Sequence, residues 1–259
     1  MSTADRQDWG LPNEWELAET RLELLEASHD PSSIQRATAL GVGPGWDCLE
    51  AGAGHGSFAR WLASRVGESG SVLAVDIDTR LLEGIEGVEV RRMDLAADEL
   101  PREAFDFAHS RLVLMHIPSR DEVLRRLTEA LRPGGLLMVE EDDSLTVQMS
   151  PDGPYREAWH AFVEVMSAAG TDPAWARDLP RRLDSLGLDD VDAEVVAQLF
   201  RGRSDPARFW SLSWLQTRER VVAAGVPADL VDSARAALED PGQWFHGPSK
   251  IMAWGRRPG

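Results

Sequence analysis

The chain has 259 residues and a formal net charge of −17, because 44 acidic residues outnumber 27 basic ones. Such a surface repels phosphate backbones and anionic lipids, which argues against nucleic acid or a membrane as a partner. The single cysteine, Cys48, leaves no disulfide framework and no thiolate metal cluster. The first residues show no basic segment followed by an apolar one, so we expect a cytoplasmic protein with one hydrophobic core.

Residues 1–44 precede the first expected strand and should form a helical cap. Asn13 is a suitable N-cap for a first helix, with Glu16 as its third residue. A second helix is expected to begin at Asp30 and Pro31 and to stop at Gly41. Ligands of an open parallel sheet bind over the carboxyl ends of its strands, so this segment can close over a ligand. Ordinary packing on the sheet explains it equally well.

The segment from Trp46 to about Ile77 predicts a strand, a glycine turn, a helix and a second strand. The first strand ends in Glu50 and the second in Asp76, and the helix between them carries one apolar face. The turn has a glycine at every second position, Gly52, Gly54 and Gly56. Glycines let a ligand approach the backbone, and an acid at the next strand end can bind ribose hydroxyls. This unit therefore predicts a nucleoside site.

A dinucleotide matches this turn less well. Its fingerprint places a glycine or alanine three residues after the second glycine, where this chain has Ser57. In addition, the charge of Glu50 would repel a pyrophosphate by about 1 to 4 kcal/mol at about 4 Å, depending on the effective dielectric. An NAD(P)-dependent oxidoreductase is therefore the weaker alternative.

The following segment predicts three more strands. They are expected at residues 88–93, 105–110 and 136–139. A short helix is expected around residues 81–82, before the first of them. Ser119 with Glu122 has the pattern of a capping box for a helix that runs to Leu131. Asp94 is the third acid that follows an apolar strand.

Beyond Asp143 the pattern predicts alternating helices and strands. Helices are expected from Pro154, from Asp172 and Pro173, and from Asp205 and Pro206, with strands at 191–200 and 250–254. The fold class is therefore α/β, a seven-stranded and mostly parallel sheet with its last strand antiparallel and helices on both faces. We expect one domain over 1–259, with a cap at 1–44, a cofactor-binding core at 45–143, and substrate-side helical insertions within 144–259.

Four stretches resemble the Rossmann-like class I S-adenosylmethionine (SAM) methyltransferases. They read LEAGAGHGS, VLAVDID, FDFAHSRLVLMHIP and LRPGGLLMVEEDD, and they follow one register from about Trp46 to Asp143. The resemblance implies SAM as cofactor, S-adenosylhomocysteine (SAH) as product, and a small apolar or aromatic molecule of bacterial secondary metabolism as methyl acceptor. A SAM-binding protein that transfers no methyl group is the second alternative.

The resemblance also assigns cofactor contacts to the strand ends. Asp76 would hold the ribose, Ile77 would pack on the adenine, and Asp94 would accept a hydrogen bond from the adenine amino group. Arg111 would meet the methionine carboxylate, or form a surface salt bridge instead. The expected cofactor residues are Glu50, Ala51, Gly52, Gly54, Asp76, Ile77, Asp94, Leu95, Ser110 and Arg111.

The acceptor side offers weaker signals. His116 lies just past the fourth strand, where it resembles the catalytic base of plant-type O-methyltransferases, although related enzymes keep a histidine there for packing alone. A base is optional, because the sulfonium leaves as a neutral group and alignment dominates. His109 lies within the strand and is expected in the core. Four tryptophans could line an acceptor pocket or belong to the core: Trp15, Trp159, Trp210 and Trp214.

The acid run Glu140–Asp143 follows the fifth strand. Consecutive residues cannot all face one divalent ion, so we expect a solvated or substrate-facing run and no metal. The identity of the acceptor and its methylated atom stay open, and both a monomer and a homodimer fit the sequence.

Overall fold

The computed structural model describes residues 15–259, so Asn13, the expected N-cap, lies outside the described residues. The contacts within the chain form two compact units. The sheet unit comprises residues 29–142, 175–196 and 250–259, and the helical unit comprises, among the described residues, 15–28, 143–174 and 197–249. The expectation of one domain over 1–259 stays a prediction.

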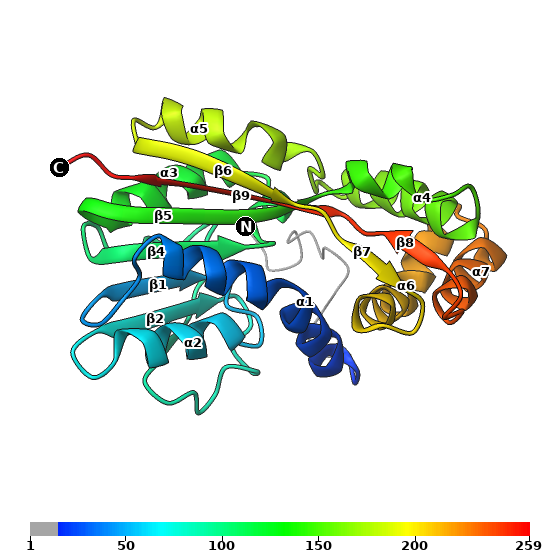
Figure 1. Cartoon of the computed structure of the whole chain (residues 1–259), viewed down its shortest axis with the longest axis horizontal. Helices are drawn as coiled ribbons and strands as arrows, with labels where there is room; N and C mark the ends of the chain where they lie inside the picture. Colours follow the sequence, from blue (N-terminus) through cyan, green and yellow to red (C-terminus); the bar gives the residue numbers. More distant parts are fainter. Residues whose placement is uncertain (1–14) are drawn as a thin grey trace. The chain divides into compact units, whose positions relative to one another are not determined.

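A seven-stranded sheet forms the centre of the sheet unit (Figure 1). Its strands are β1 (Asp47–Ala51), β2 (Ser71–Asp76), β3 (Glu89–Arg92), β4 (Phe105–Arg111), β5 (Leu131–Asp143), β6 (Asp189–Val196) and β9 (Ser249–Arg256). They lie in the order β3-β2-β1-β4-β5-β9-β6. The strands β1 to β5 pair in parallel, whereas β6 and β9 pair antiparallel. The expected Rossmann-like α/β architecture, mostly parallel with one antiparallel strand, is confirmed.

Helices cover both faces of this sheet, because successive strand residues point to opposite sides. The helices of the sheet unit are α2 (Ser57–Val66), α3 (Arg120–Ala130), α5 (Leu179–Ser185) and the second half of α1 (Ala18–Ala39), with short 3-10 helices η2 (Leu114–His116) and η4 (Trp175–Asp178). Leu49 and Leu137 pack in the core that includes α3 and α5. Their chain neighbours Cys48 and Leu136 pack in the opposite core, with α2 and the end of α1.

The helical unit has its own aromatic core. It contains the first half of α1, η3 (Ser144–Met149), α4 (Pro154–Ala168), α6 (Asp205–Ala223), α7 (Ala228–Leu238) and a two-stranded sheet of β7 (Leu199–Arg201) and β8 (Trp244–His246). Tyr155, Trp159, Trp210 and Trp214 are buried together with Leu24 of α1. Within residues 15–259, no helix combines the length and the hydropathy that crossing a membrane requires.

The N-terminal region differs from the two expected helices. A single helix, α1, runs from Ala18 to Ala39 and contains Pro31. Proline removes one amide donor and crowds the carbonyl four residues earlier, here that of Ala27, which is exposed and can therefore be solvated. The ammonium of Lys250 donates to the carbonyl of His29, and the Ser33 hydroxyl oxygen lies 3.0 Å from the same carbonyl oxygen, which gives this turn additional polar contacts. These contacts explain how the helix continues through the proline.

Three local predictions were wrong. Residues 81–82 form turns rather than a short helix. The strand expected at 191–200 divides, because β6 ends at Val196 and Phe200 belongs to β7 in the helical unit. Ser119 precedes α3 as expected, but its side chain makes no capping hydrogen bond. The backbone amide of Glu122 donates to the backbone carbonyl of Ser119 instead of to its hydroxyl.

Candidate functional site

The predicted cofactor residues meet at one edge of the sheet. Parallel pairing aligns Ala51 with Val75 of β2 and with Ser110 of β4, and aligns Asp76 with Arg92 of β3. The carboxyl ends of all four strands therefore coincide. This edge is where an open α/β sheet binds its ligand.

The glycine turn after β1 is held against the end of β2. Gly52 and Gly54 have φ angles of 84° and 59°, a region that side chains disfavour. The Gly54 amide donates to Asp76 Oδ2 at 2.9 Å, and the Asp78 amide donates to Oδ1 at 3.0 Å. A Cβ on Gly54 would meet no atom within 4 Å, whereas one on Gly52 would lie 2.1 Å from Val113 Cγ2. Open space therefore lies beside Gly54, and packed core beside Gly52.

Asp76 and its neighbours offer a polar group beside an apolar surface. Burial raises the pKa of Asp76, and the amides of Asp78 and Gly54 oppose this by binding the charged form. Ile77, which follows it, is 37% exposed. After β3, the carboxylate of Asp94 accepts a hydrogen bond from the Ala96 amide, while Leu95 is buried. The second and third strand ends thus present two carboxylates and an exposed isoleucine.

Glu50 lies in a buried charge network that sequence reasoning missed. Its carboxylate is 2.6 Å from Nδ1 of His109, whose Nε2 is 3.0 Å from Glu140. All three side chains are buried. Burial disfavours the imidazolium, but the two carboxylates outweigh it and raise the pKa of His109. The prediction that His109 lies within the strand is confirmed, yet its role there is ionic.

Lys250, the chain's single lysine, completes this network. Its Nζ lies 2.7 Å from Glu140 Oε2 and 3.0 Å from the Ser33 hydroxyl, which itself donates to Glu140 at 2.8 Å. Burial would raise the pKa of Glu140, but His109 and Lys250 hold it far below its ordinary value. A lone lysine in an apolar final strand was the available sequence signal, because a buried ammonium needs a partner.

Arg111 forms a salt bridge, but a largely buried one and not the surface pair that was one of its two expected roles. Its guanidinium lies 2.8 Å from Asp30 and donates to the Ser33 hydroxyl at 3.0 Å. The Ser57 hydroxyl, at the start of α2, also donates to Asp30. Ser110, the residue before Arg111, has a buried hydroxyl oxygen without a hydrogen-bond partner among the described residues. A contact of Arg111 or Ser110 with the cofactor stays a prediction.

The acid run Glu140–Asp143 lies at the end of β5 and is largely buried, which corrects the expectation of a solvated run. Glu140 and Glu141 are fully enclosed, and Asp143 is nearly so. Glu141 accepts the amides of Leu114 at 2.7 Å and Val113 at 3.2 Å, so it caps η2. Burial raises the pKa of Glu141 to about 8. The run forms the end of the strand, where the consecutive residues Glu140 and Glu141 each find partners from other elements.

His116 is the last residue of η2. Burial and the nearby charge of Arg120 lower its pKa to about 3, so the imidazole is neutral and weakly basic near neutral pH. This environment favours packing over base catalysis. The base role stays a prediction that a variant can test.

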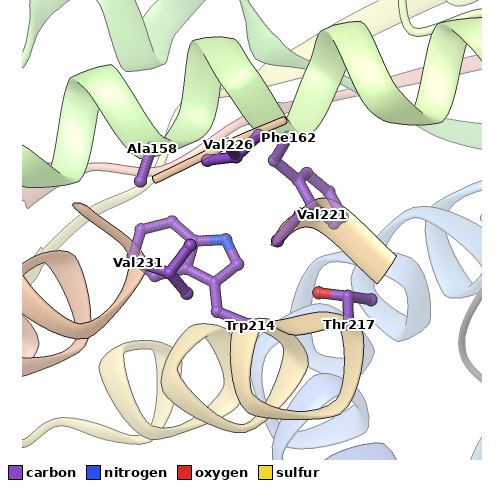
Figure 2. A pocket seen from close by; sticks show the side chains of 7 residues that line it. All are labelled: Ala158, Phe162, Trp214, Thr217, Val221, Val226 and Val231. Atoms are coloured by element: carbon purple, nitrogen blue, oxygen red, sulfur yellow. The ribbon is translucent and has the colours of Figure 1, made fainter. Parts of the chain in front are cut away.

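Three of the four predicted acceptor-side tryptophans lie in the core of the helical unit. The Trp159 and Trp210 rings are 4.4 Å apart, and Trp214 lies 6.5 Å from Trp159. Figure 2 shows a small cavity beside Trp214, in which the centre of a water molecule has ≈ 10 Å³ of room. Trp15 is half-buried and lies three residues before α1 begins. This cavity is too small for an aromatic acceptor, and a role of these residues in acceptor binding stays a prediction.

Known proteins show where this chain belongs. A family model described as a methyltransferase domain matches residues 49–139. Methyltransferase GfsG of Streptomyces halstedii is 34% identical over 194 residues, which cover 66% of this chain and 67% of that protein. Methyltransferase str2 of Strobilurus tenacellus is 30% identical over 165 residues, 61% of this chain and 59% of that protein.

A solved structure agrees with the fold. Phosphoethanolamine N-methyltransferase 2 of Haemonchus contortus, in complex with SAH, aligns with a TM-score of 0.62 and 18% identity over 98% of this chain and 60% of that one. The chain spans 60%, 59% and 65% of the length of three curated relatives. The glycine turn, the acid-ended strands and these matches identify the chain as a member of the SAM-dependent methyltransferase family.

Proposed function

We propose that this protein transfers the methyl group of SAM to a small organic molecule with an apolar or aromatic body. The observation that carries the proposal is the hydrogen bond between Asp76 and Gly54 at the carboxyl edge of the sheet. It places a preoriented carboxylate beside an open glycine turn, as a nucleoside with free ribose hydroxyls requires.

The residues present fit SAM. The open space beside Gly54 would admit the part of the cofactor that lies against the glycine turn. Asp76 accepts hydrogen bonds from two backbone amides and has further lone pairs that could accept from ribose hydroxyls. Ile77 offers an exposed apolar surface for adenine, and Asp94 would bind its amino group. Ala51, Gly52, Leu95 and Ser110 would complete the cradle. Glu50 would stabilise this binding site through its contact with His109 and not through a contact with the ligand.

Bound SAM supplies an electrophilic methyl group on a sulfonium, and its leaving group departs uncharged. The protein therefore needs to hold the acceptor in line and exclude water more than it needs to move a proton. With its pKa lowered to about 3, His116 is poorly suited to take one. The chemistry best suited to this site is transfer to a nucleophile that is reactive without a strong base.

Two experiments test this proposal. Calorimetry with SAM, SAH and NAD should show binding of the first two and none of the third, and the reverse pattern would reject a methyltransferase. The protein should then be incubated with methyl-labelled SAM and a panel of phenols, amines and activated carbon acids. The labelled methyl group should appear in the products of one of these acceptor classes. A protein that binds SAM but leaves the label in place with every acceptor class would be a SAM-binding protein without transfer.

A further inference from the structure

The turn after β4 holds a leucine in a backbone conformation that suits glycine. Leu112 directly follows the last residue of β4 and has a φ of 57°. Three other non-glycine residues in the described part of the chain have a positive φ, and all three carry charged side chains. The left-handed region is unfavourable for leucine and persists only where surrounding contacts enforce it. Such strain is concentrated at functional sites, so the contacts that hold Leu112 are informative.

The end of β5 supplies these contacts. The Leu112 amide donates to the backbone carbonyl of Glu140 at 2.8 Å. The next two amides, those of Val113 and Leu114, donate to Oε1 of Glu141 at 3.2 and 2.7 Å. Glu141 is fully buried, and its second carboxyl oxygen, Oε2, has no hydrogen-bond partner among the described residues. The hydrogen bonds of this buried carboxyl group therefore go to the turn after β4.

The turn after β4 also supports the glycine turn after β1. A Cβ on Gly52 would lie 2.1 Å from Cγ2 of Val113, so the Val113 side chain lies where a side chain of Gly52 would be. The amides of Gly52 and Ala53 donate to the carbonyl of Val75 at 2.8 and 3.1 Å. The glycine turn is thus fixed by β2 through hydrogen bonds and by Val113 through packing. The packing contact depends on the residue that holds Val113 in place, which is Glu141.

We propose that Glu141 is a positioning residue for the cofactor, which fixes residues 112–114 and through Val113 sets the position of the glycine turn against which SAM binds. The inference rests on the proposed function, and it assigns Glu141 no contact with SAM or the acceptor. Burial raises the pKa of Glu141 to about 8, so the group is largely protonated at neutral pH. It then resembles the neutral amide of glutamine, whose carbonyl oxygen can also accept two hydrogen bonds.

The test measures SAM affinity by calorimetry of full-length variants, each well below its thermal midpoint. Glu141→Met keeps the bulk of the side chain but removes the acceptor, so SAM binding should weaken by about 3- to 10-fold, the equivalent of one net hydrogen bond. Glu141→Gln should bind SAM as tightly as the wild type, because its amide oxygen can accept both bonds. Asp143→Leu is the matched control, since Asp143 is a buried acid of the same strand that caps η3 through the Leu145 amide at 2.7 Å. Its SAM affinity should be unchanged.

A rescue separates positioning from general stability. Leu112→Gly removes the strain that Glu141 offsets, because glycine adopts a φ near 57° freely. Added to Glu141→Met, it should restore most of the lost SAM affinity, and by itself it should change the affinity little. If Glu141 were only structural, the double variant would bind SAM no better than Glu141→Met, because glycine also increases the entropy of the unfolded chain.

Four results would each overturn the inference: wild-type SAM affinity in folded Glu141→Met, an equal loss in Asp143→Leu, an equal loss in Glu141→Gln, or no recovery by Leu112→Gly. If Glu141→Met does not fold, Val113→Ala decides, because it removes the packing against Gly52 and leaves the buried acid in place. It should weaken SAM binding, and unchanged affinity would overturn the inference. Failure of the wild type to bind SAM would count against the proposed function, whereas the variants test Glu141 in a protein that binds SAM.

Discussion

Asp76 Oδ2 accepts a hydrogen bond from the backbone amide of Gly54 at 2.9 Å, which joins the end of β2 to the glycine turn after β1. The two residues are 22 positions apart in the chain and come from adjacent parallel strands. The acid thus has two functions at once. It shapes the turn, and its remaining acceptor capacity is what we propose binds the ribose hydroxyls.

Replacing Asp76 by alanine should weaken SAM binding at least tenfold. The loss of a charged acceptor from two hydroxyls costs about 1.5 to 3 kcal/mol. Isothermal titration with SAM measures this effect. Asp78→Ala is the control. Asp78 is a nearby carboxylate, but its side chain pairs with Arg80 and not with the glycine turn. Equal SAM affinity in a folded Asp76→Ala protein would remove Asp76 from the site.

The two glycines should respond differently to substitution. Gly54→Val should abolish SAM binding, because its side chain would fill the open space beside the turn and its φ of 59° is disfavoured for a branched residue. Gly52→Ala should instead lower the free energy of unfolding by about 1 to 3 kcal/mol, since its Cβ would lie 2.1 Å from Val113 Cγ2.

Urea unfolding and SAM titration of both variants separate the two effects. Val113→Ala added to Gly52→Ala should recover part of the lost stability, because it removes the clashing methyl group. A Gly54→Val protein that binds SAM as tightly as the wild type would show that the ligand does not approach the turn.

His116→Ala should retain most of the methyl-transfer rate. The pKa of His116 lies near 3, so its protonation state does not change between pH 5 and pH 9, and no histidine step should appear in the rate profile. Single-turnover rates with the true acceptor measure this. A loss of about 10²- to 10⁴-fold at unchanged SAM affinity would instead establish a base role. Trp159→Ala and Trp210→Ala should be more damaging, provided that their thermal stability is compared in parallel.

His109→Phe should destabilise the protein most in mildly acidic solution. The pKa of His109 is higher in the folded protein than in the unfolded chain, where it is about 6.5. The charge of His109 therefore contributes its full stabilisation below about pH 6.5, and this stabilisation is lost as the pH rises through the pKa of the folded state. Glu140 acts in the opposite sense, since its lowered pKa gives stability that is lost as pH falls below about 4.5. His109→Phe, which leaves the buried carboxylates without their histidine partner, should therefore lower the free energy of unfolding by about 3 to 5 kcal/mol near pH 6.

Urea unfolding of the wild type and His109→Phe at pH 6 and pH 9 checks this sign. The difference in unfolding free energy should shrink at the higher pH. A difference that grows with pH would show that His109 is neutral between its two carboxylates. His160→Phe, at an exposed position of α4, serves as the control.

Much of the fold follows from local pattern. The strand, glycine turn, helix and strand of residues 46–77 are set by apolar spacing and by glycines, which act on neighbours in the chain. The same holds for α4 and α6, whose starts at Pro154 and Asp205–Pro206 agree with the expected positions. The positions of Asp76 and Asp94 at strand ends were likewise visible, because an acid that directly follows an apolar run must emerge at the end of that strand.

Local sequence patterns were therefore sufficient to predict the family, the parallel sheet and the edge at which the proposed cofactor residues lie. The pairing of the buried charges, in contrast, could be seen only in the folded chain. Glu50 meets His109 across 59 positions and Ser33 meets Lys250 across 217. The physical reason is that a buried charge is tolerated or costly according to the partner that packing brings to it, and that partner is set by long-range contacts rather than by chain neighbours.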